Sequence, residues 1–326
     1  MKKVLAVFFV LMLFRLATMA QVNEISIKDL SVPTSPGLVL LDKAPASIEK
    51  PTSPKTFGIS VLRLLQENEG AMEFTPYWFW NHPGLTFSDY IKNISPVLQT
   101  LNLSVAAAQR DTSTYLSVGF RTQVLRRYDA AQLAKIDQKV KEITAALSDD
   151  PDSLDLTKLE KLKGDLSAIR AAPLINIEVA GAIAGYSPDN KFSHLGNNRY
   201  GAWANFNYHP KDGSPFNALG VVRFTRAIAP AGKASGQDSS FIDYGVAAAY
   251  NNNKFDLQLE YVRRNDVLNH GTYNRLAFVG NYLFTDNLVI VASFGKDFAA
   301  ENNIIALFGI KFGISNEKLK VIKEGM

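Results

Sequence analysis

The chain contains no cysteine and only four histidines in 326 residues. Without cysteine it forms no disulfide bond, no thiolate metal site and no lipid-modified cysteine after a leader. Beyond the first twenty residues, no stretch approaches the roughly 18 apolar residues that a membrane-spanning helix needs. The 35 basic and 31 acidic residues nearly balance. This balance excludes the basic surface typical of a protein that binds nucleic acid.

The sequence also lacks the common catalytic motifs: G-x-S-x-G, H-E-x-x-H, a P-loop and a dinucleotide fingerprint. A barrel lipase would need a His and a Ser two residues apart on one strand, and no His-x-Ser occurs. The stretch from Asp149 to Glu160 has the length of a calcium loop, but Pro151 and Leu154 occupy ligand and glycine positions. We therefore expect no enzyme, cofactor or metal. The histidines fall in predicted loops or at strand ends: His82, His194, His209 and His270.

The first twenty residues read as a secretory signal peptide. Lys2 and Lys3 precede an apolar run from Val4 to Phe14, and small residues lead to a cleavage site after Ala20. Eleven residues span only about 16 Å as a helix, too short for a hydrocarbon core of ~30 Å. The sequence therefore predicts export.

Four further regions follow the predicted signal. Residues 21–54 are rich in proline, which removes backbone donors, and should form an extended arm in the periplasm or inside a barrel. Residues 55–314 show the texture of a membrane β-barrel, interrupted by a helical insertion at 128–172. Residues 315–326 form a tail.

Segments of about ten residues that alternate apolar with polar or small side chains are typical of membrane barrels. A soluble β-sandwich is the alternative, but the polar set is rich in Gly, Ala, Asn and Ser, which suits a confined lumen. We predict an all-β, antiparallel, up-and-down transmembrane barrel of about twelve strands, near 56–66, 70–80, 97–109, 114–126, 174–186, 198–209, 216–228, 241–250, 254–264, 272–284, 287–297 and 302–314.

Aromatic residues recur near the predicted strand ends, as the two interfacial girdles of a barrel require. If the N-terminus is periplasmic, the periplasmic girdle comprises Trp78, Trp80, Tyr208, Tyr250 and Tyr282, with Phe216, Phe255 and Phe284 beside them. The opposite ends carry Tyr115, Tyr186, Tyr200, Phe241, Tyr261 and Tyr273.

The insertion shows helical spacing. Apolar residues recur every three or four positions from Leu133 to Leu147 and from Leu159 to Ile169, and Asp129 with Gln132 fits a capping box. We expect a helical hairpin at 129–172. Counting strands places it in the periplasm, where it could bind a protein partner, whereas an error of one strand would place it outside the cell.

Charged residues on the polar phase of the strands should face inward. These are Arg121, Glu178, Arg223, Asp243, Asp256, Glu260, Arg275 and Lys311. The pattern predicts three cross-strand pairs, Arg121 with Glu178, Arg223 with Asp243, and Glu260 with Arg275. A fourth pair would join Arg63 to Glu73. The pairs could line a selective pore or simply fill a narrow lumen, and their balanced signs favour filling.

Two stretches, Ser35-Pro36-Gly37-Leu38-Val39-Leu40-Leu41-Asp42 and Ile48-Glu49-Lys50-Pro51-Thr52-Ser53-Pro54-Lys55, resemble the segment before the first strand in uncharacterised outer-membrane barrel proteins of Bacteroidota, a porin-like group. Glu73-Phe74-Thr75-Pro76-Tyr77-Trp78 fits the same group. The resemblance covers about the first third of the chain and implies an outer-membrane location but no ligand. Residues 315–326 depart from the usual barrel, which ends with its last strand.

Three functions fit these observations. A narrow or plugged channel for a small solute, of unknown identity, is the leading hypothesis. Twelve strands tilted at about 40° would leave a lumen of roughly 10 Å, which residues 21–54 could enter. The alternatives are a structural or assembly partner in an outer-membrane complex and a barrel-type lipid hydrolase. In each case outer-membrane lipid surrounds the barrel.

Overall fold

A computed structural model describes residues 32–33, 35–41, 48–51, 53–67, 70–110, 113–148, 156–189, 191, 194–210, 214–228, 238–252, 254–285, 288–296 and 304–312. The predicted signal peptide (1–20) and tail (315–326) lie outside these residues, as does much of the predicted arm. The described part contains one antiparallel sheet of eleven strands. They are β1 (Gly70–Phe74), β2 (Asn102–Arg110), β3 (Ser113–Arg127), β4 (Ile175–Ser187), β5 (Gly196–Tyr208), β6 (Phe216–Ala227), β7 (Ser239–Asn251), β8 (Phe255–Asp266), β9 (Thr272–Thr285), β10 (Leu288–Lys296) and β11 (Ile304–Phe312).

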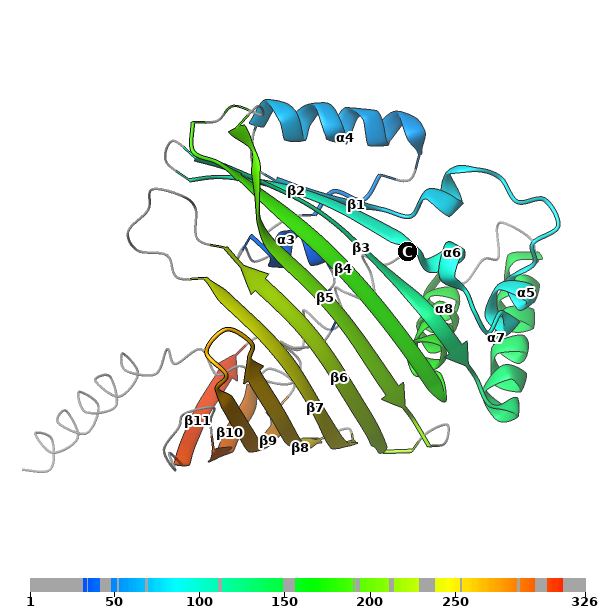
Figure 1. Cartoon of the computed structure of the whole chain (residues 1–326). Coiled ribbons are helices and arrows are strands. Elements are labelled where there is room, and N and C mark those ends of the chain that lie inside the picture. Colours follow the sequence, from blue (N-terminus) through cyan, green and yellow to red (C-terminus); the bar gives the residue numbers. More distant parts are fainter. Residues whose placement is uncertain are drawn as a thin grey trace, which may run out of the picture.

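Each strand pairs with its neighbours in sequence, from β1 to β11 without a crossover, and the sheet curls (Figure 1). This is the up-and-down order that the sequence predicts. Within the described ranges no pairing joins β1 to β11, so closure into a barrel stays a prediction. Beside β1, Glu49 forms a parallel bridge with Met72. Its amide donates to the Ala71 carbonyl at 2.9 Å, and the Glu73 amide donates to the Glu49 carbonyl at 2.8 Å.

The expectation of twelve strands is wrong at the first one. Residues 56–66 belong to the helix α4 (Pro54–Glu67). The Ser53 side chain accepts from the Thr56 amide at 3.2 Å, and Pro54 opens the first turn, where its missing donor costs nothing. Phe57, Val61 and Leu64, at helical spacing, pack on the outer side of β1 and β2. No helix in the described part of the chain is long and apolar enough to cross a membrane.

The second and third predicted strands are shorter than expected. β1 ends at Phe74, since Pro76 has no N–H for the ladder and instead begins the 3-10 helix η1 (Pro76–Phe79). Trp78 therefore lies in η1 and Trp80 follows it. The helices α5 (Phe87–Lys92) and α6 (Val97–Thr100) come next, and β2 begins only at Asn102.

Because β3 extends beyond the start of β2, part of its edge would lack partners. The segment before β2 satisfies that edge. The Arg126 amide donates to the Ile94 carbonyl at 2.8 Å, and the Gln123 amide donates to Thr100 Oγ1 at 3.0 Å. α6 is thereby fixed against the end of β3.

The two faces of the sheet have opposite character. On the face that we call inner, Asp243, Glu260 and Arg275 are at most 2% exposed. On the outer face, large apolar side chains are roughly half exposed, among them Val246 at 62% and Leu259 at 53%. Others are Val118, Phe120, Phe206, Val222, Ile242, Leu276, Phe278, Phe294 and Phe308. This inverts the arrangement of a soluble sheet.

The helices α7 (Ala130–Ser148) and α8 (Leu156–Ala171) lie between β3 and β4, where the apolar spacing predicts two helices. The expected capping box is present. The Gln132 amide donates to Asp129 Oδ1 at 2.7 Å, and the Asp129 amide donates to Gln132 Oε1 at 3.0 Å. Ile136 packs with Ile91 of α5 and Tyr128, and Lys139 pairs with Asp165 at 3.3 Å. We call this end of the sheet the helical end (Figure 1).

Residues 32–33 and 35–41, which we call the inner segment, pack on the inner face. Its short helix α3 (Pro36–Val39) contacts β2, β3 and β4. The Gly37 amide donates to Ser104 Oγ at 3.1 Å, and Arg199 donates to the Leu40 carbonyl at 2.8 Å. Small side chains beneath it leave the necessary room. The apolar contacts are Leu38, Leu40 and Leu41 against Ala106, Ala108, Ala180, Ala184 and Trp203. Part of the predicted arm therefore lies inside the curled sheet.

Gly119 permits this close approach, because a Cβ there would lie 2.9 Å from the Gly37 nitrogen and 3.0 Å from the Gly181 oxygen. We expect Gly119→Ala to lower the free energy of unfolding by about 1–3 kcal/mol through overpacking. Gly220→Ala in β6 is the matched control, where the nearest atom would be 3.7 Å away. Urea titration measures both variants, and equal effects would contradict the packing argument.

Candidate functional site

On β6 to β9, the strand register agrees with the inward phase of the predicted charges. Arg223 pairs with Asp243 across β6 and β7, and Asp256 pairs with Asn281 across β8 and β9. Directly opposed residues of an antiparallel ladder share a face. Lys311 pairs with Val289 in the backbone register of β10 and β11.

Arg223 and Asp243 form the predicted ion pair, with Arg223 Nη2 donating to Asp243 Oδ2 at 2.7 Å. Asp243 has a second partner, since Arg264 Nε donates to its other oxygen at 2.7 Å. Asp243 is 0% exposed and both arginines are largely buried. One carboxylate thus holds two guanidinium groups, and the guanidinium of Arg264 also lies 5.0 Å from the ring centre of Phe241.

Glu260 and Arg275 form the second predicted pair, with side chains 2% and 1% exposed. Gln258 Nε2 donates to the other Glu260 oxygen at 2.8 Å. Asp256 lies nearer the helical end and accepts from Asn281 Nδ2 at 3.2 Å. The inner face of β6 to β9 is therefore crossed by paired charges.

The other two predicted pairs are wrong. In the register of β3 and β4, Arg121 lies opposite Ala180, and Gln123 lies opposite Glu178 and donates through Nε2 to Glu178 Oε1 at 3.1 Å. Arg121 instead lies where its charge acts on the buried Glu73. Arg63 belongs to the helix α4 and pairs with Glu49 at 2.5 Å.

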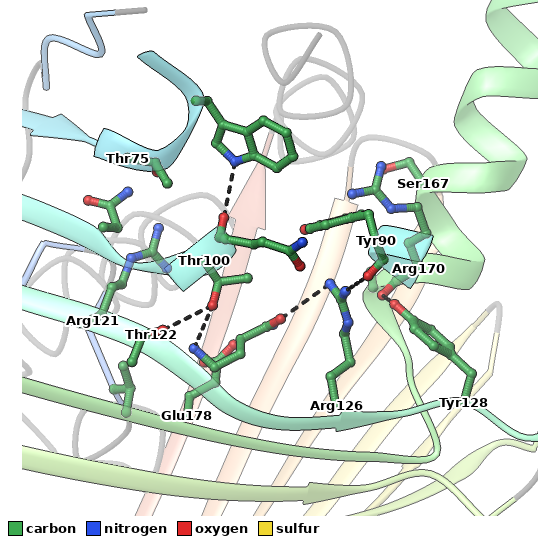
Figure 2. Close-up of a pocket in the computed structure, with 16 residues that line it drawn as sticks. Thr75, Tyr90, Thr100, Arg121, Thr122, Arg126, Tyr128, Ser167, Arg170 and Glu178 are labelled. Carbon is green, nitrogen blue, oxygen red and sulfur yellow. Dashed lines mark hydrogen bonds between the residues drawn. The ribbon is translucent and has the colours of Figure 1, made fainter. Parts of the chain in front are cut away.

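A cavity of about 480 Å³ lies at the helical end of the inner face, between η1, α6, β3 and α8 (Figure 2). Its wall contains three arginines, Arg121, Arg126 and Arg170, and one carboxylate, Glu178. Aromatic side chains and small hydroxyl groups complete it: Trp78, Tyr90, Tyr128, Thr75, Thr100, Thr122 and Ser167.

Backbone and aromatic contacts hold the arginines of the cavity in place. Arg126 Nη2 donates to the Tyr90 carbonyl at 2.6 Å, and its guanidinium lies 4.5 Å from the centre of the Tyr90 ring. Arg170 lies over the rings of Phe87 and Tyr90. The Tyr128 hydroxyl donates to the Arg170 carbonyl at 2.9 Å. Burial raises the pKa of Tyr128, which therefore stays a neutral donor at neutral pH.

The predicted girdle is found in part. At the helical end, Tyr250 packs on Phe216 with ring centres 5.0 Å apart, and Tyr282 packs on Phe255 at 4.8 Å. Tyr208 is exposed on the same outer face. Trp78 is wrongly assigned, because it lines the cavity and donates to the Gln99 carbonyl at 3.0 Å. Trp80 lies outside the strands and is 64% exposed.

At the opposite end the predicted girdle is mostly wrong. Tyr115 packs on Tyr186 on the inner face, with ring centres 5.1 Å apart. Phe241 lies under Arg264, and Tyr273 is paired with Arg264 in the ladder. Tyr200 lies on the outer face opposite Arg226, and Tyr261 sits on the outer face of β8, opposite Val246 and Leu276.

Two important arginines on the strands, Arg264 and Arg126, were not predicted, and neither was Arg170 of α8. Arg264 shares the period-two phase of Asp256 and Glu260, so extending that phase by four residues would have found it. No sequence pattern marks Arg126 as inward-facing. Strict alternation from Arg121 places position 126 on the outer face, and only the bulge after Gln123 returns it to the inner face. Among the described residues, no group of three His, Asp or Glu could hold a metal ion.

Comparison with known proteins gives little. No protein-family model matches the chain, and no curated protein matches it. A solved structure described as "NanC porin structure in rhombohedral crystal form" is similar at 10% sequence identity with a TM-score of 0.32. The match covers 65% of this chain and 86% of that one. A likeness this weak assigns no fold, which rests here on the strand pairing.

The stability of the protein should respond differently when the two charges are exchanged in the Glu260–Arg275 pair and in the Arg223–Asp243 pair. Arg275→Glu alone should cost about 3–5 kcal/mol of unfolding free energy, because it leaves Glu260 buried beside a like charge. Adding Glu260→Arg should recover much of the loss. Exchanging Arg223 with Asp243 should recover less, because the new arginine at position 243 faces Arg264. Urea titration of the single and double variants measures this, and equal recovery in both exchanges would contradict a shared Asp243.

Proposed function

We propose that the protein is a non-enzymatic outer-membrane β-barrel that acts as a narrow channel for a small solute, with the inner segment as its plug. The observation that carries the proposal is the inverted sheet, with half-exposed apolar side chains outside and largely buried ion pairs inside. In water the outer face would be a large unfavourable apolar surface. In a bilayer it is the surface that hydrocarbon requires. The resemblance to barrel proteins of Bacteroidota and the predicted signal peptide agree with this location.

Two different sets of groups cover the inner face, and together they would leave only a narrow path for a solute. Ion pairs occupy the side formed by β6 to β9, and the inner segment covers β2 to β5. Two hollows, about 480 Å³ and 240 Å³, lie at the helical end. The smaller is lined by polar residues that include Asn207, Asn217 and Asp256. A solute entering from this end meets the larger hollow beside the inner segment.

The alternative, a structural or assembly partner acting through residues 129–172, has less support. Apolar residues of α7 and α8 pack with those of α5 and with Tyr128, and Ile136, Leu159 and Leu162 are at most 8% exposed. In the described part of these two helices, Leu147 is the large apolar residue left exposed. A barrel-type lipid hydrolase remains the least favoured reading, because the sequence has no His-x-Ser strand.

The first test concerns location. The mature protein should fractionate with the outer membrane and migrate faster unboiled than boiled on a denaturing gel, because a closed barrel stays folded in detergent until heated. Recovery as a soluble periplasmic protein without this shift would exclude the barrel.

The second test concerns the plug. Deleting residues 21–41, which keeps the Glu49 bridge to β1, should raise single-channel conductance in planar bilayers, because the inner face of β2 to β5 becomes open. Wild-type protein should conduct weakly. Large stable wild-type channels, or no change on deletion, would contradict a plug. The gel shift serves as the control that the deleted protein is folded.

The third test concerns orientation. Three strands, and not the predicted four, precede α7 and α8, so counting from a periplasmic N-terminus no longer places these helices in the periplasm. Short connections join β7 to β8 and β9 to β10 at the helical end, and barrels place such turns in the periplasm. Since the chain has no cysteine, Lys161→Cys in α8 and Val267→Cys at the other end report cleanly. A membrane-impermeant thiol reagent should label intact cells at position 267 only, and position 161 after permeabilisation. The reverse pattern would place the helices outside the cell.

A further inference from the structure

The larger cavity carries an excess of positive charge. Arg121, Arg126 and Arg170 lie in its wall, whereas Glu178 is its one carboxylate. Glu73 of β1 is buried outside this wall, and its carboxyl group interacts with the charge of Arg121, so it offsets at most one further positive charge. The Glu178 carboxylate already accepts from Gln123 and Asn176, each at 3.1 Å. Two carboxylates therefore face three guanidinium groups, and one positive charge is left without a counterion among these five residues.

The same arginines have unused donors. The Nε atoms of Arg121, Arg126 and Arg170 are all buried and have no hydrogen-bond partner among the described residues. The whole Arg126 residue is only 4% exposed. Leaving such donors unpaired away from water is costly. Guanidinium groups satisfy planar oxyanions best, through paired charge-assisted hydrogen bonds.

The cavity also has aromatic surfaces that suit the organic part of a negatively charged ligand. The indole of Trp78 and the rings of Tyr90 and Tyr128 form part of the wall. Figure 2 shows Arg121 and Arg126 rising from β3, with Tyr90, Tyr128 and Arg170 grouped beside Arg126. A volume of about 480 Å³ falls within the usual range for small-molecule sites.

We infer that this cavity binds a small organic anion. The arginines would bind the carboxylate group of this anion, and the aromatic wall would contact its unsaturated or apolar part. The inference deepens the proposed channel, on which it rests, by naming the chemical class of its solute. Binding nevertheless needs only the folded protein and can be measured without a membrane.

The probe is benzoate, titrated into the full-length protein in detergent micelles and followed by calorimetry. Neutral benzamide, of nearly the same shape, is the matched control and should bind at least about tenfold more weakly, the loss expected for one charge-assisted hydrogen bond. Inorganic phosphate should also bind more weakly, since it cannot use the aromatic wall. Equal binding of benzamide and benzoate would overturn recognition of charge, and equal binding of phosphate would overturn the organic part.

Variants locate the site. Arg121→Gln should weaken benzoate binding about tenfold, and Arg170→Gln should act in the same direction. Arg226→Gln is the matched control, an exposed arginine on the outer face of β6, and should leave binding unchanged. The gel shift confirms folding, and Arg170→Gln decides the question if Arg121→Gln fails to fold. An equal loss from Arg226→Gln would overturn the location.

The two proposals fail in distinguishable ways. Benzoate binding with no conductance from the deleted protein would reject the channel and keep the site. Conductance without benzoate binding would keep the channel and reject the anionic solute.

Discussion

The structure depends on the burial of charge on one face of a sheet whose other face is apolar and exposed. Asp243, Glu260 and Arg275 are sealed from solvent, and each has an opposite charge within ion-pair distance. A buried charge without a partner would destabilise the sheet by several kcal/mol, roughly 3–5 on removal of one partner. The ion pairs are therefore a condition for curling β6 to β9 around a narrow interior, whether or not they also select ions.

The rest of the interior is arranged around that constraint. Across β2 to β5 small residues replace the ion pairs, and the inner segment fills the space with Leu38, Leu40 and Leu41. Its backbone groups are satisfied by the sheet, as in the bonds from Gly37 to Ser104 and from Arg199 to Leu40. A peptide held by such specific contacts is a built part of the interior, and its removal would expose a polar, small-residue wall.

The helical end follows from a difference in strand length. β3 has 15 residues and β2 has nine, so the edge of β3 needs other partners. The α6 segment supplies them, and α5 then packs against Ile136 of α7. The cavity forms between these helices and the sheet. Its arginines come from β3 and α8, elements that the chain brings together only because the helical insertion returns to the sheet at β4.

Much of the fold could be predicted from period-two alternation, which depends only on the geometry of a strand. It predicted nine of the eleven described strands closely and the inward phase of Arg223, Asp243, Glu260 and Arg275, and it placed the shorter β1 and β2 only approximately. Helical spacing located α7 and α8 for the same local reason. It also fits α4, where Phe57, Val61 and Leu64 follow it, although alternation predicts a strand at 56–66.

Only the tertiary structure decided the candidate site. The bulge in β3 changes which residues face inward, and nothing local in the sequence marks it, because it depends on the pairing with β4. Three features depend on contacts between residues far apart in the chain. They are the second arginine on Asp243, the position of Trp78 in a cavity wall, and the packing of the inner segment on the sheet. The sequence by itself determined which residues alternate, whereas the meeting of three arginines around one cavity was decided by packing.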